Sequence, residues 1–328
     1  MPDDSLPARD PKARKGDPAP TPEHLEEDTS SYLAEDPADS APTSPLEDLP
    51  EGLLHHPNFQ VIRELGRGGM GVVYLAERDD GTKAAVKTII PAAAGTPKQV
   101  ERFLREADVL RQLRHPHVVE FYESGEVNGL LYFAMEYVPG TNAATLVRRD
   151  GPYPTRTAVR LGAQMLDALA FAHDRKFVHR DIKPANLLLT KGPDGRTMAK
   201  LADFGLARVY AASQMSGLTV TGEIGGTAAF MPPEQVTDYR EVRPAADQYA
   251  AAATLYNLLT AKLLYDCPAS PVLALLKVLE EDPVPLRDRR PEVPEGLAAV
   301  IHRALARDPA ARWPDARAFR QALLAAAA

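Results

Sequence analysis

The sequence of 328 residues predicts an α+β fold with two lobes, a small β-rich one followed by a larger and mainly helical one. Strand-like patterns broken by glycine turns fill residues 59–136, whereas apolar residues recur at helical spacing from Thr155 onward. A chain of this length can bury a sizeable core. The single cysteine, Cys267, excludes a disulfide framework and fits a reducing compartment.

Residues 1–56 differ in composition from the rest of the chain. They contain ten prolines and 14 Asp and Glu against 4 Lys and Arg, a net charge of −10, whereas the whole chain carries −7. Such a segment cannot bury enough apolar surface to offset its ordering entropy, so we expect a disordered acidic tail. The nearly balanced remainder gives no case for nucleic-acid binding.

No secretory signal is visible, because the N-terminus is acidic and rich in proline. The most apolar long run, residues 249–265, contains Thr254, Asn257 and Lys262, which favours a buried core helix over a membrane span. The expected location is therefore the cytoplasm, with no membrane segment in this chain.

The first motif joins two predicted strands through a run of glycines. Residues 59–65 and 72–76 alternate in the manner of strands and flank Gly66-Arg67-Gly68-Gly69-Met70-Gly71. A dinucleotide site needs a helix after the glycines, and a Walker A loop needs a Lys followed by Ser or Thr; neither is present. A glycine flap over nucleotide phosphates is favoured, since glycines let backbone N–H groups approach anions.

A lone cation lies in the next apolar strand. Asp79-Asp80-Gly81 predicts a hairpin turn, and Lys87 follows within the strand 84–89. A buried ammonium is costly unless it is paired or binds an anion. On the following predicted helix, 98–113, Glu101 and Glu106 are the candidate partners.

The next segments lead from the first lobe to the second. His115-Pro116-His117 predicts a turn into strand 118–123 and not a metal site, because no third ligand lies nearby. Strand 130–135 ends at Pro139-Gly140, and residues 155–173 form an amphipathic helix.

The chemistry centres on a charged loop between two apolar runs, residues 178–189. Asp181 can accept a proton from a hydroxyl, Lys183 can neutralise a phosphate, and Asn186 can hold a divalent metal. Asp203-Phe204-Gly205 adds a second acidic motif. Phosphoryl transfer needs such parts, because its transition state spreads negative charge over several oxygens and depends mainly on positioning.

These motifs resemble the catalytic loop and the metal-binding turn of eukaryotic-type (Hanks-type) Ser/Thr protein kinases, including bacterial members. The resemblance covers residues 59–325. It implies a bilobal protein-kinase fold over residues 57–326, divided into an N-lobe (57–138) and a C-lobe (139–326). Lys183-Pro184 implies Ser/Thr specificity over Tyr specificity.

The resemblance also assigns roles to individual residues. It implies that Asp181 is the catalytic base, that Lys183 stabilises the transferring group, and that Lys87, paired with Glu106, grips the phosphates. Asn186 and Asp203 would hold Mg²⁺, with Mn²⁺ as a substitute. Met135 would close the back of the adenine pocket, and the backbone of Glu136 and Val138 would hydrogen-bond the base, so their side chains should tell little. The remaining residues expected to contact the nucleotide are Leu65, Gly66, Gly68, Gly71, Val73, Ala85 and Leu188.

Regulatory and structural positions follow from the same resemblance. Between Gly205 and Met231 the chain is rich in Ser and Thr, and Thr219 and Thr221 match sites of activating phosphorylation, for which Arg180 would provide a charged partner. Thr227 would contact the catalytic Asp. Glu234 is expected to pair with Arg312, and Asp247 to cap its helix and hold the catalytic-loop backbone.

The sequence thus predicts a Ser/Thr protein kinase that transfers the γ-phosphoryl group of ATP to protein hydroxyls. Expected partners are protein substrates, and a transient homodimer would serve trans-autophosphorylation. The alternative is a pseudokinase scaffold that binds nucleotide without chemistry. A small-molecule phosphotransferase of similar fold is a further alternative. The pseudokinase class usually lacks the Lys, the catalytic Asp or the second Asp, and all three are present here.

Overall fold

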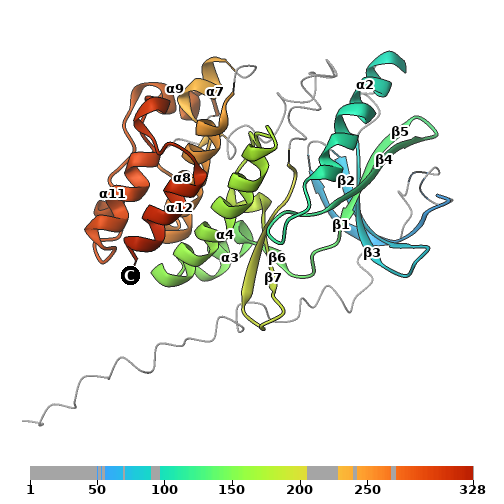
Figure 1. The fold of residues 1–328 in the computed structure, drawn as a ribbon, viewed down its shortest axis with the longest axis horizontal. Helices are drawn as coiled ribbons and strands as arrows, with labels where there is room; N and C mark the ends of the chain where they lie inside the picture. Colours follow the sequence, from blue (N-terminus) through green and yellow to red (C-terminus); the bar gives the residue numbers. More distant parts are fainter. Residues whose placement is uncertain are drawn as a thin grey trace, which may run out of the picture.

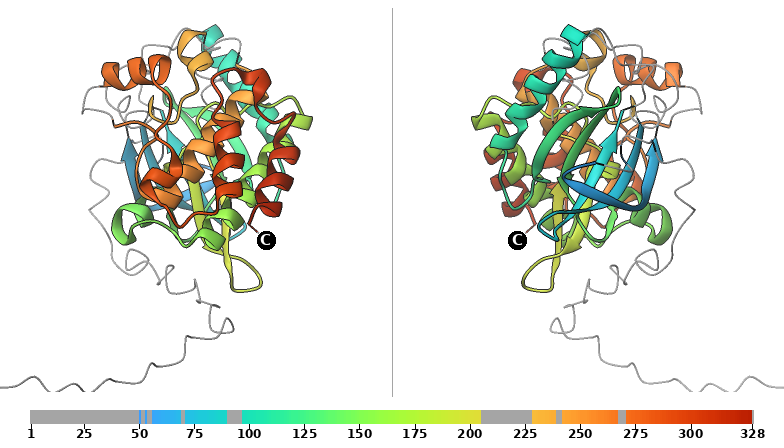
Figure 2. Two further views of the ribbon diagram at one scale, coloured as in Figure 1. Left: turned by 90° about the vertical axis from the view of Figure 1, so that its left-hand side faces the viewer. Right: turned by 90° about the vertical axis from the view of Figure 1, so that its right-hand side faces the viewer.

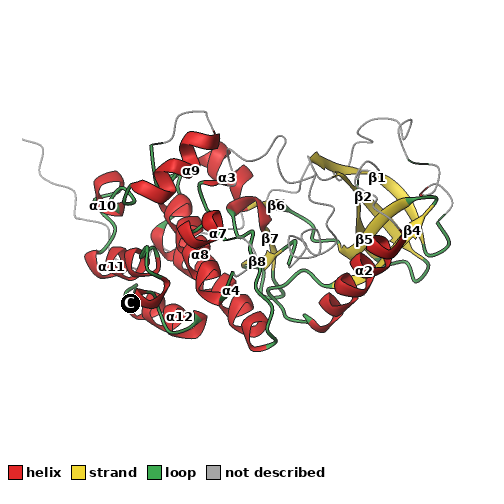
Figure 3. Cartoon of the chain, turned by 90° about the horizontal axis from the view of Figure 1, so that it is seen from above, coloured by secondary structure: helices red, strands yellow, loops and turns green. Residues whose placement is uncertain are grey.

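The computed structural model describes residues 50, 53, 56–68, 71–89, 97–204, 228–238, 242–266 and 271–327. The chain forms two lobes that lie side by side, one built on a sheet and the other on helices (Figure 1). The view from above separates the yellow strands of the N-lobe from the red helices of the C-lobe (Figure 3). The predicted α+β, two-lobed fold is confirmed.

The N-lobe sheet is antiparallel, with strand order β1-β2-β3-β5-β4. Its strands are β1 (Phe59–Gly68), β2 (Gly71–Arg78), β3 (Lys83–Thr88), β4 (Phe121–Val127) and β5 (Leu130–Glu136). Helix α2 (Pro97–Asp108) continues as the 3-10 turn η6 (Val109–Gln112), so the predicted helix 98–113 tightens in its last turn. Phe103 of α2 stacks on Phe133 of β5, and both are fully buried, which fixes α2 on the sheet.

The predicted tail and the folded part overlap. Leu53, within the expected disordered segment 1–56, is fully buried in the N-lobe core, and His56 stacks on Phe59. Burying a leucine side chain contributes roughly 1.5–3 kcal/mol, which favours ordering of its neighbourhood. Residues 1–49, which carry most of the predicted tail, lie outside the described residues.

The turn at His115-Pro116-His117 joins the lobes. Val119 N–H donates to Leu201 O (2.9 Å), and Leu201 N–H donates to His117 O (2.9 Å). A ring nitrogen of His117 bonds Ala199 O at 2.9 Å. The two histidines therefore serve this connection, and no group of three potential metal ligands occurs among the described residues.

The C-lobe begins with a small sheet, β6-β7-β8, formed by β6 (Thr141–Asn142), β7 (Leu187–Lys191) and β8 (Thr197–Leu201). Strands β7 and β8 form an antiparallel hairpin. The 3-10 turn η7 (Pro184–Asn186) enters β7, and the segment after β8 leads to Asp203. The hairpin therefore carries both acidic motifs on adjacent strand ends.

Helices make up the rest of the C-lobe, with α8 at its centre (Figure 2). They are α3 (Ala143–Asp150), α4 (Thr155–Asp174), α7 (Pro233–Thr237), α8 (Pro244–Thr260), α9 (Pro271–Glu280), α10 (Leu286–Arg289), α11 (Glu295–Ala304), the 3-10 turn η9 (Pro309–Ala311) and α12 (Ala316–Ala325). The alanines 250–253 are all buried, and their small side chains let α4 and α11 approach α8 closely. Gly162 of α4 meets Leu255, where a Cβ would lie 2.4 Å from Leu255 Cδ2. None of the helices in the described part of the chain is both long enough and apolar enough to cross a membrane.

Candidate active site

Lys87, the residue before the end of β3, projects toward the segment after β8. Its Nζ lies 2.8 Å from Oδ2 of Asp203, with the two side chains 12% and 26% exposed. The contact joins the N-lobe sheet to the C-lobe hairpin across 116 positions of sequence. Strand pairing places Val73 opposite Lys87 and Met135 opposite Ala85, so these four residues share one face of the sheet.

Asp203 has a strained backbone and a perturbed carboxylate. Its φ is +59°, a left-handed conformation that costs a non-glycine residue about 1 kcal/mol or more and clusters at functional sites. Burial alone would raise the pKa of Asp203, but the nearby charge of Lys87 lowers it below its ordinary value, with a smaller contribution from Lys183. Asp203 is therefore an anion at neutral pH.

The loop of residues 178–189, predicted to be catalytic, brings three of the predicted residues together. Asn186 Nδ2 donates to the backbone oxygen of Asp181 at 2.8 Å and to its Oδ2 at 3.0 Å. Lys183 Nζ lies 3.2 Å from the same Oδ2. These contacts hold the Asp181 carboxylate in one orientation. Because Asn186 uses its amide nitrogen here, its Oδ1 is the atom left to accept or coordinate.

His179 supports this loop from within. It is fully buried; its Nε2 donates to Ala202 O at 3.0 Å, and its Nδ1 accepts from the N–H of Asp181 at 3.3 Å. This pattern corresponds to a neutral ring with the proton on Nε2. His179 also packs against Phe204, with ring centroids 4.4 Å apart. The two acidic motifs are therefore connected through one imidazole.

Asp247 of α8 holds the same loop through hydrogen bonds to its carboxylate. Its Oδ2 accepts from His179 N–H (2.8 Å) and from His173 Nε2 (2.8 Å), while Oδ1 accepts from Arg180 N–H (2.9 Å). Arg180 has φ +71°, so Asp247 stabilises a strained turn immediately before Asp181. Burial would raise the pKa of Asp247, but the hydrogen bond from His173 lowers it below its ordinary value.

The prediction that Asp247 holds the loop is thus borne out, whereas the prediction that it caps the helix is wrong. Helix α8 begins at Pro244, with Arg243 in the N-cap position. Asp247 lies one turn inside, and its carboxylate is committed to the loop amides. Proline suits the first helical position because its missing N–H is not needed there.

The comparisons with known proteins agree with this geometry. The model of the protein kinase domain matches residues 59–323. The chain belongs to the protein kinase family. Two relatives are serine/threonine-protein kinase PknF of Mycobacterium tuberculosis, 37% identical over 270 residues, and PknB of Mycolicibacterium smegmatis, 37% identical over 275 residues. Each alignment covers 81% of this chain, but only 55% of PknF and 42% of PknB.

A solved structure extends the comparison to the fold. The crystal structure of the Mycobacterium tuberculosis PknI kinase domain superposes with a TM-score of 0.65 and 31% identity. The superposition covers 84% of this chain and 99% of that chain. The likeness therefore reaches both lobes of the kinase domain described above.

The hinge between the kinase lobes contains a contact that sequence reasoning missed. Lys200 Nζ lies 2.7 Å from Oε1 and 2.8 Å from Oε2 of Glu136, so β8 is tied to the end of β5. Glu136 N–H donates to Glu120 O at 2.8 Å. The Glu136 side chain thus has a structural role, and the contact of its backbone with the base stays a prediction. No local pattern signals this pair, because 64 positions separate its members.

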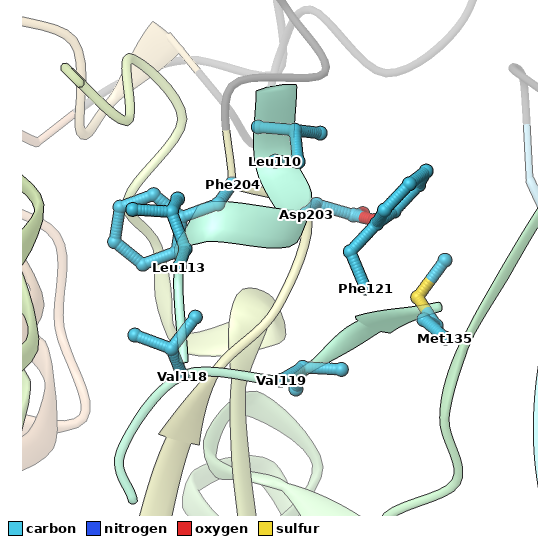
Figure 4. Close-up of a pocket in the computed structure, with 8 residues that line it drawn as sticks. All are labelled: Leu110, Leu113, Val118, Val119, Phe121, Met135, Asp203 and Phe204. Carbon is cyan, nitrogen blue, oxygen red and sulfur yellow. The ribbon is translucent and has the colours of Figure 1, made fainter. Parts of the chain in front are cut away.

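A small apolar cavity lies behind Met135, between η6, β4 and Asp203. Figure 4 shows Asp203 in the middle of this pocket, Phe204 on one side and Phe121 with Met135 on the other. The cavity measures about 20 Å³, the space of one water molecule. Met135 lines this cavity, and its place at the back of an adenine site stays a prediction.

Two of the predicted glycines differ in what they require. A Cβ on Gly71 would lie 1.8 Å from Thr88 O, and φ is +142°, so only glycine fits between β2 and β3. Gly66 has open space around it. Gly71 is therefore needed for packing, whereas a role for Gly66 facing phosphates remains a prediction. Gly68 pairs with Gly71 in the β1–β2 ladder.

The predicted anchor of the kinase C-lobe is present. Arg312 NH1 lies 2.6 Å from Oε1 and NH2 2.8 Å from Oε2 of Glu234, a bidentate pair with the arginine side chain fully buried. Arg312 Nε and NH1 also donate to Ala306 O and Ala245 O, each at 2.8 Å. This pair fixes the start of α7, five residues after the described chain resumes at Ala228.

Several predicted residues lie outside what the structure describes. Thr219, Thr221 and Thr227 fall in the undescribed stretch 205–227. Glu106 lies on α2, but its side chain is not described, so the expected pair with Lys87 stays a prediction. Leu65, Val138 and Leu188 are described and half-buried, on β1, in the hinge and on β7 respectively.

Proposed function

We propose that this protein is a Ser/Thr protein kinase that transfers the γ-phosphoryl group of ATP to Ser and Thr hydroxyls of proteins. The observation that carries the proposal is the convergence of Lys183 and Asn186 on Oδ2 of Asp181, at 3.2 and 3.0 Å, together with the Lys87–Asp203 pair. The curated relatives are Ser/Thr-protein kinases by name, and Lys183-Pro184 supports the same specificity.

The residues fit a nucleotide with a divalent metal. Asp203 uses Oδ2 for Lys87, and Asn186 uses Nδ2 for Asp181, which leaves an oxygen on each for Mg²⁺ or Mn²⁺. Such oxygen ligands suit Mg²⁺. When bound, the metal would neutralise negative charge on the nucleotide phosphates.

The protein residues then have distinct tasks. Asp181 accepts the proton of the acceptor hydroxyl while the oxygen–phosphorus bond forms and the bond from phosphorus to the nucleotide diphosphate breaks. Lys183 offsets charge on the transferring group, and Lys87 orients the phosphates. His179 and Asp247 are positioning residues, since they keep the loop that presents Asp181 in its strained form.

The adenine would bind between the lobes. Glu136 already uses its N–H on Glu120 O, so its carbonyl oxygen and the backbone of Val138 are the groups proposed to contact the base. Leu65, Val73, Ala85, Leu188 and Met135 would enclose the ring, and Gly66, Gly68 and Gly71 would lie over the phosphates. Glu106 would pair with Lys87 in the active form. The domain is proposed to run over 57–326, with the lobes meeting at 138–139.

Activation is proposed to follow autophosphorylation of Thr219 or Thr221 in trans, through a transient homodimer. A phosphate carries about −1.5 to −2 charges at neutral pH and forms strong pairs with guanidinium groups. Arg180, adjacent to Asp181, is the proposed partner. Protein substrates and a cytoplasmic location complete the proposal.

Incubation of the chain with labelled ATP, Mg²⁺ and a generic basic protein tests the activity. The Asp181→Asn variant should bind nucleotide nearly as well and lose transfer by about 10²–10⁴-fold, because the catalytic base is removed. Nucleotide binding without any transfer by the native chain would favour the pseudokinase alternative. Phosphopeptide mapping that finds label only within residues 1–56 would contradict the choice of Thr219 and Thr221.

A further inference from the structure

A second cavity lies in the C-lobe and contains none of the residues proposed to act on nucleotide. Its volume is about 720 Å³. The C-terminal end of α4, the start of α8 and the segment from η9 to the start of α12 form its walls, and these elements pack on one another (Figure 1). The cavity is large enough for several side chains of a peptide.

Cations outnumber anions in the walls. Lys176, Arg243, Arg303, Arg312 and Arg317 line the cavity, against Asp174 and Asp315. Two of these cations are already matched, since Arg312 pairs with Glu234 and Arg317 pairs with Asp174. Asp315 uses its Oδ1 to accept from Ala318 N–H at the start of α12.

Three cations are left over. Lys176, Arg243 and Arg303 are exposed, and within the described part of the chain none has a carboxylate at salt-bridge distance. Arg303 lies over the Trp313 ring, 4.0 Å from its centroid, and among the described residues donates only to the backbone oxygens of Ala311 and Arg312, at 3.4 and 3.5 Å. The cavity is therefore an electropositive site with an aromatic surface.

Two independent features indicate a peptide as the occupant. Helix α8, 17 residues long, starts at the cavity without a side-chain cap, so its positive end faces the same space. Gln248 is only 2% exposed and donates from Nε2 to Trp313 O at 3.0 Å, while its buried Oε1 accepts no hydrogen bond from described residues. Carboxylates suit the cations, and a peptide N–H suits the unused oxygen.

We propose that this cavity binds the acidic N-terminal segment of the same chain, residues 17–49. That segment contains ten Asp and Glu and neither Lys nor Arg, together with Leu25, Tyr32 and Leu33 as apolar residues that can lie on Trp313. It lies outside the described residues. Tethering through Pro50 gives an effective concentration in the millimolar range, so weak charge pairs are sufficient. An extended chain spans about 3.3 Å per residue, which lets it reach the C-lobe.

The cavity also touches the support of the catalytic loop. His173 lines the cavity and donates to Asp247, which in turn holds the amides of His179 and Arg180. A bound segment therefore reduces local opening at these amides. Loss of the bound segment should speed hydrogen exchange of the His179 and Arg180 amides at least about twofold.

A zero-length carbodiimide cross-link in the full chain, read by mass spectrometry, tests the proposal directly. Lys176 is the one lysine among the described residues that line the cavity. We expect Lys176 to join Asp or Glu of residues 17–49 at least about fivefold more often than the exposed Lys191 and Lys262 do. At 1 M salt the preference should vanish, because the Debye length falls to about 3 Å.

The full-length double variant Arg243→Ala/Arg303→Ala should lower the Lys176 cross-links at least about threefold. The control Arg148→Ala/Arg156→Ala removes two exposed arginines elsewhere and should leave them unchanged. If the first variant does not fold, the variant Glu23→Gln/Glu26→Gln/Glu27→Gln/Asp28→Asn in an otherwise native chain gives the same test.

Three results would overturn the proposal. Lys176 could react no more than the control lysines, or its cross-links could persist in high salt and in the cavity variant. Cross-links found only between isotopically distinct copies would assign the cavity to a second chain. These cross-link yields do not depend on phosphoryl transfer, so their outcome is independent of the proposed activity.

Discussion

The two sides of the reaction centre are held in different ways. On the nucleotide side, Lys87 and Asp203 meet through one ion pair that spans the lobes and stays partly exposed. On the loop side, Asp247 is 1% exposed and accepts three hydrogen bonds from His173, His179 and Arg180. The first arrangement leaves the pair accessible to the phosphates and metal proposed to bind there, whereas the second fixes the position of Asp181.

This difference teaches which substitutions should affect activity and which should affect stability. Removing a partner from a buried, fully bonded group leaves donors or charges unsatisfied and costs several kcal/mol. Removing a partner from a partly exposed pair lets water replace it. We therefore expect substitutions at the buried C-lobe contacts to lower the free energy of unfolding more than substitutions at the contacts on the proposed nucleotide side.

The largest effect is expected from Arg312→Ala. It removes a buried bidentate partner of Glu234 and two bonds to backbone oxygens, so the free energy of unfolding should fall by about 3–5 kcal/mol. Chemical denaturation measures this change. A loss below about 1 kcal/mol would show that the pair does not anchor the lobe.

Asp247→Asn should follow, with a loss of about 2–3 kcal/mol at pH 7, because an amide cannot accept from all three donors. The pKa of Asp247 lies below its ordinary value in the fold, so its carboxylate stabilises the protein above about pH 4. That stabilisation is lost as the pH falls through the lowered pKa. Denaturation curves of both proteins at several pH values should therefore converge on acidification; a constant gap would contradict the linkage.

Lys87→Met should affect phosphate transfer much more than the free energy of unfolding. Transfer of phosphate should be abolished, while the free energy of unfolding changes by only about 1 kcal/mol, because Asp203 is partly exposed and gains water. Paired activity and denaturation measurements check this. A stability loss matching that of Asp247→Asn would remove the distinction between the two sides.

The smallest effect is expected from Lys200→Gln at the hinge. The pair with Glu136 lies near solvent at 25% exposure of the glutamate, and glutamine can still donate to it, so stability should change by less than about 1 kcal/mol. Since the pair links β8 to β5, KM for ATP should shift more than kcat. An unchanged KM would show that the Lys200–Glu136 contact has no role in nucleotide binding.

The sequence allowed good prediction of elements whose pattern is local. The strands around the glycines, the helix at 155–173 and the apolar helix near 249–259 are found, because their hydrophobic periods appear within a few residues. Their ends were less certain: α8 starts at Pro244, five residues before the apolar run, and Asp247 in its first turn bonds the loop amides of His179 and Arg180.

Contacts between distant segments could be predicted only where a family motif named both partners. Glu234 and Arg312 were found in that way, and their pair is present. Lys200 with Glu136, and His173 with Asp247, were not, because neither pair leaves a mark in local sequence. Leu53 was assigned to the tail because its neighbours are acidic, yet the N-lobe core provides an apolar site for it.

By itself the sequence determined the chemical groups, their order and the class of fold, because composition and periodicity are properties of the chain. Tertiary structure alone decided that Asp181 is held by Asn186 and Lys183, and that Asp247 supports a strained turn. It also decided that three cations around one cavity have no carboxylate partner among the described residues. The reason is physical: the pKa of a carboxylate and the cost of an unmatched charge depend on neighbours that only folding brings within a few ångströms.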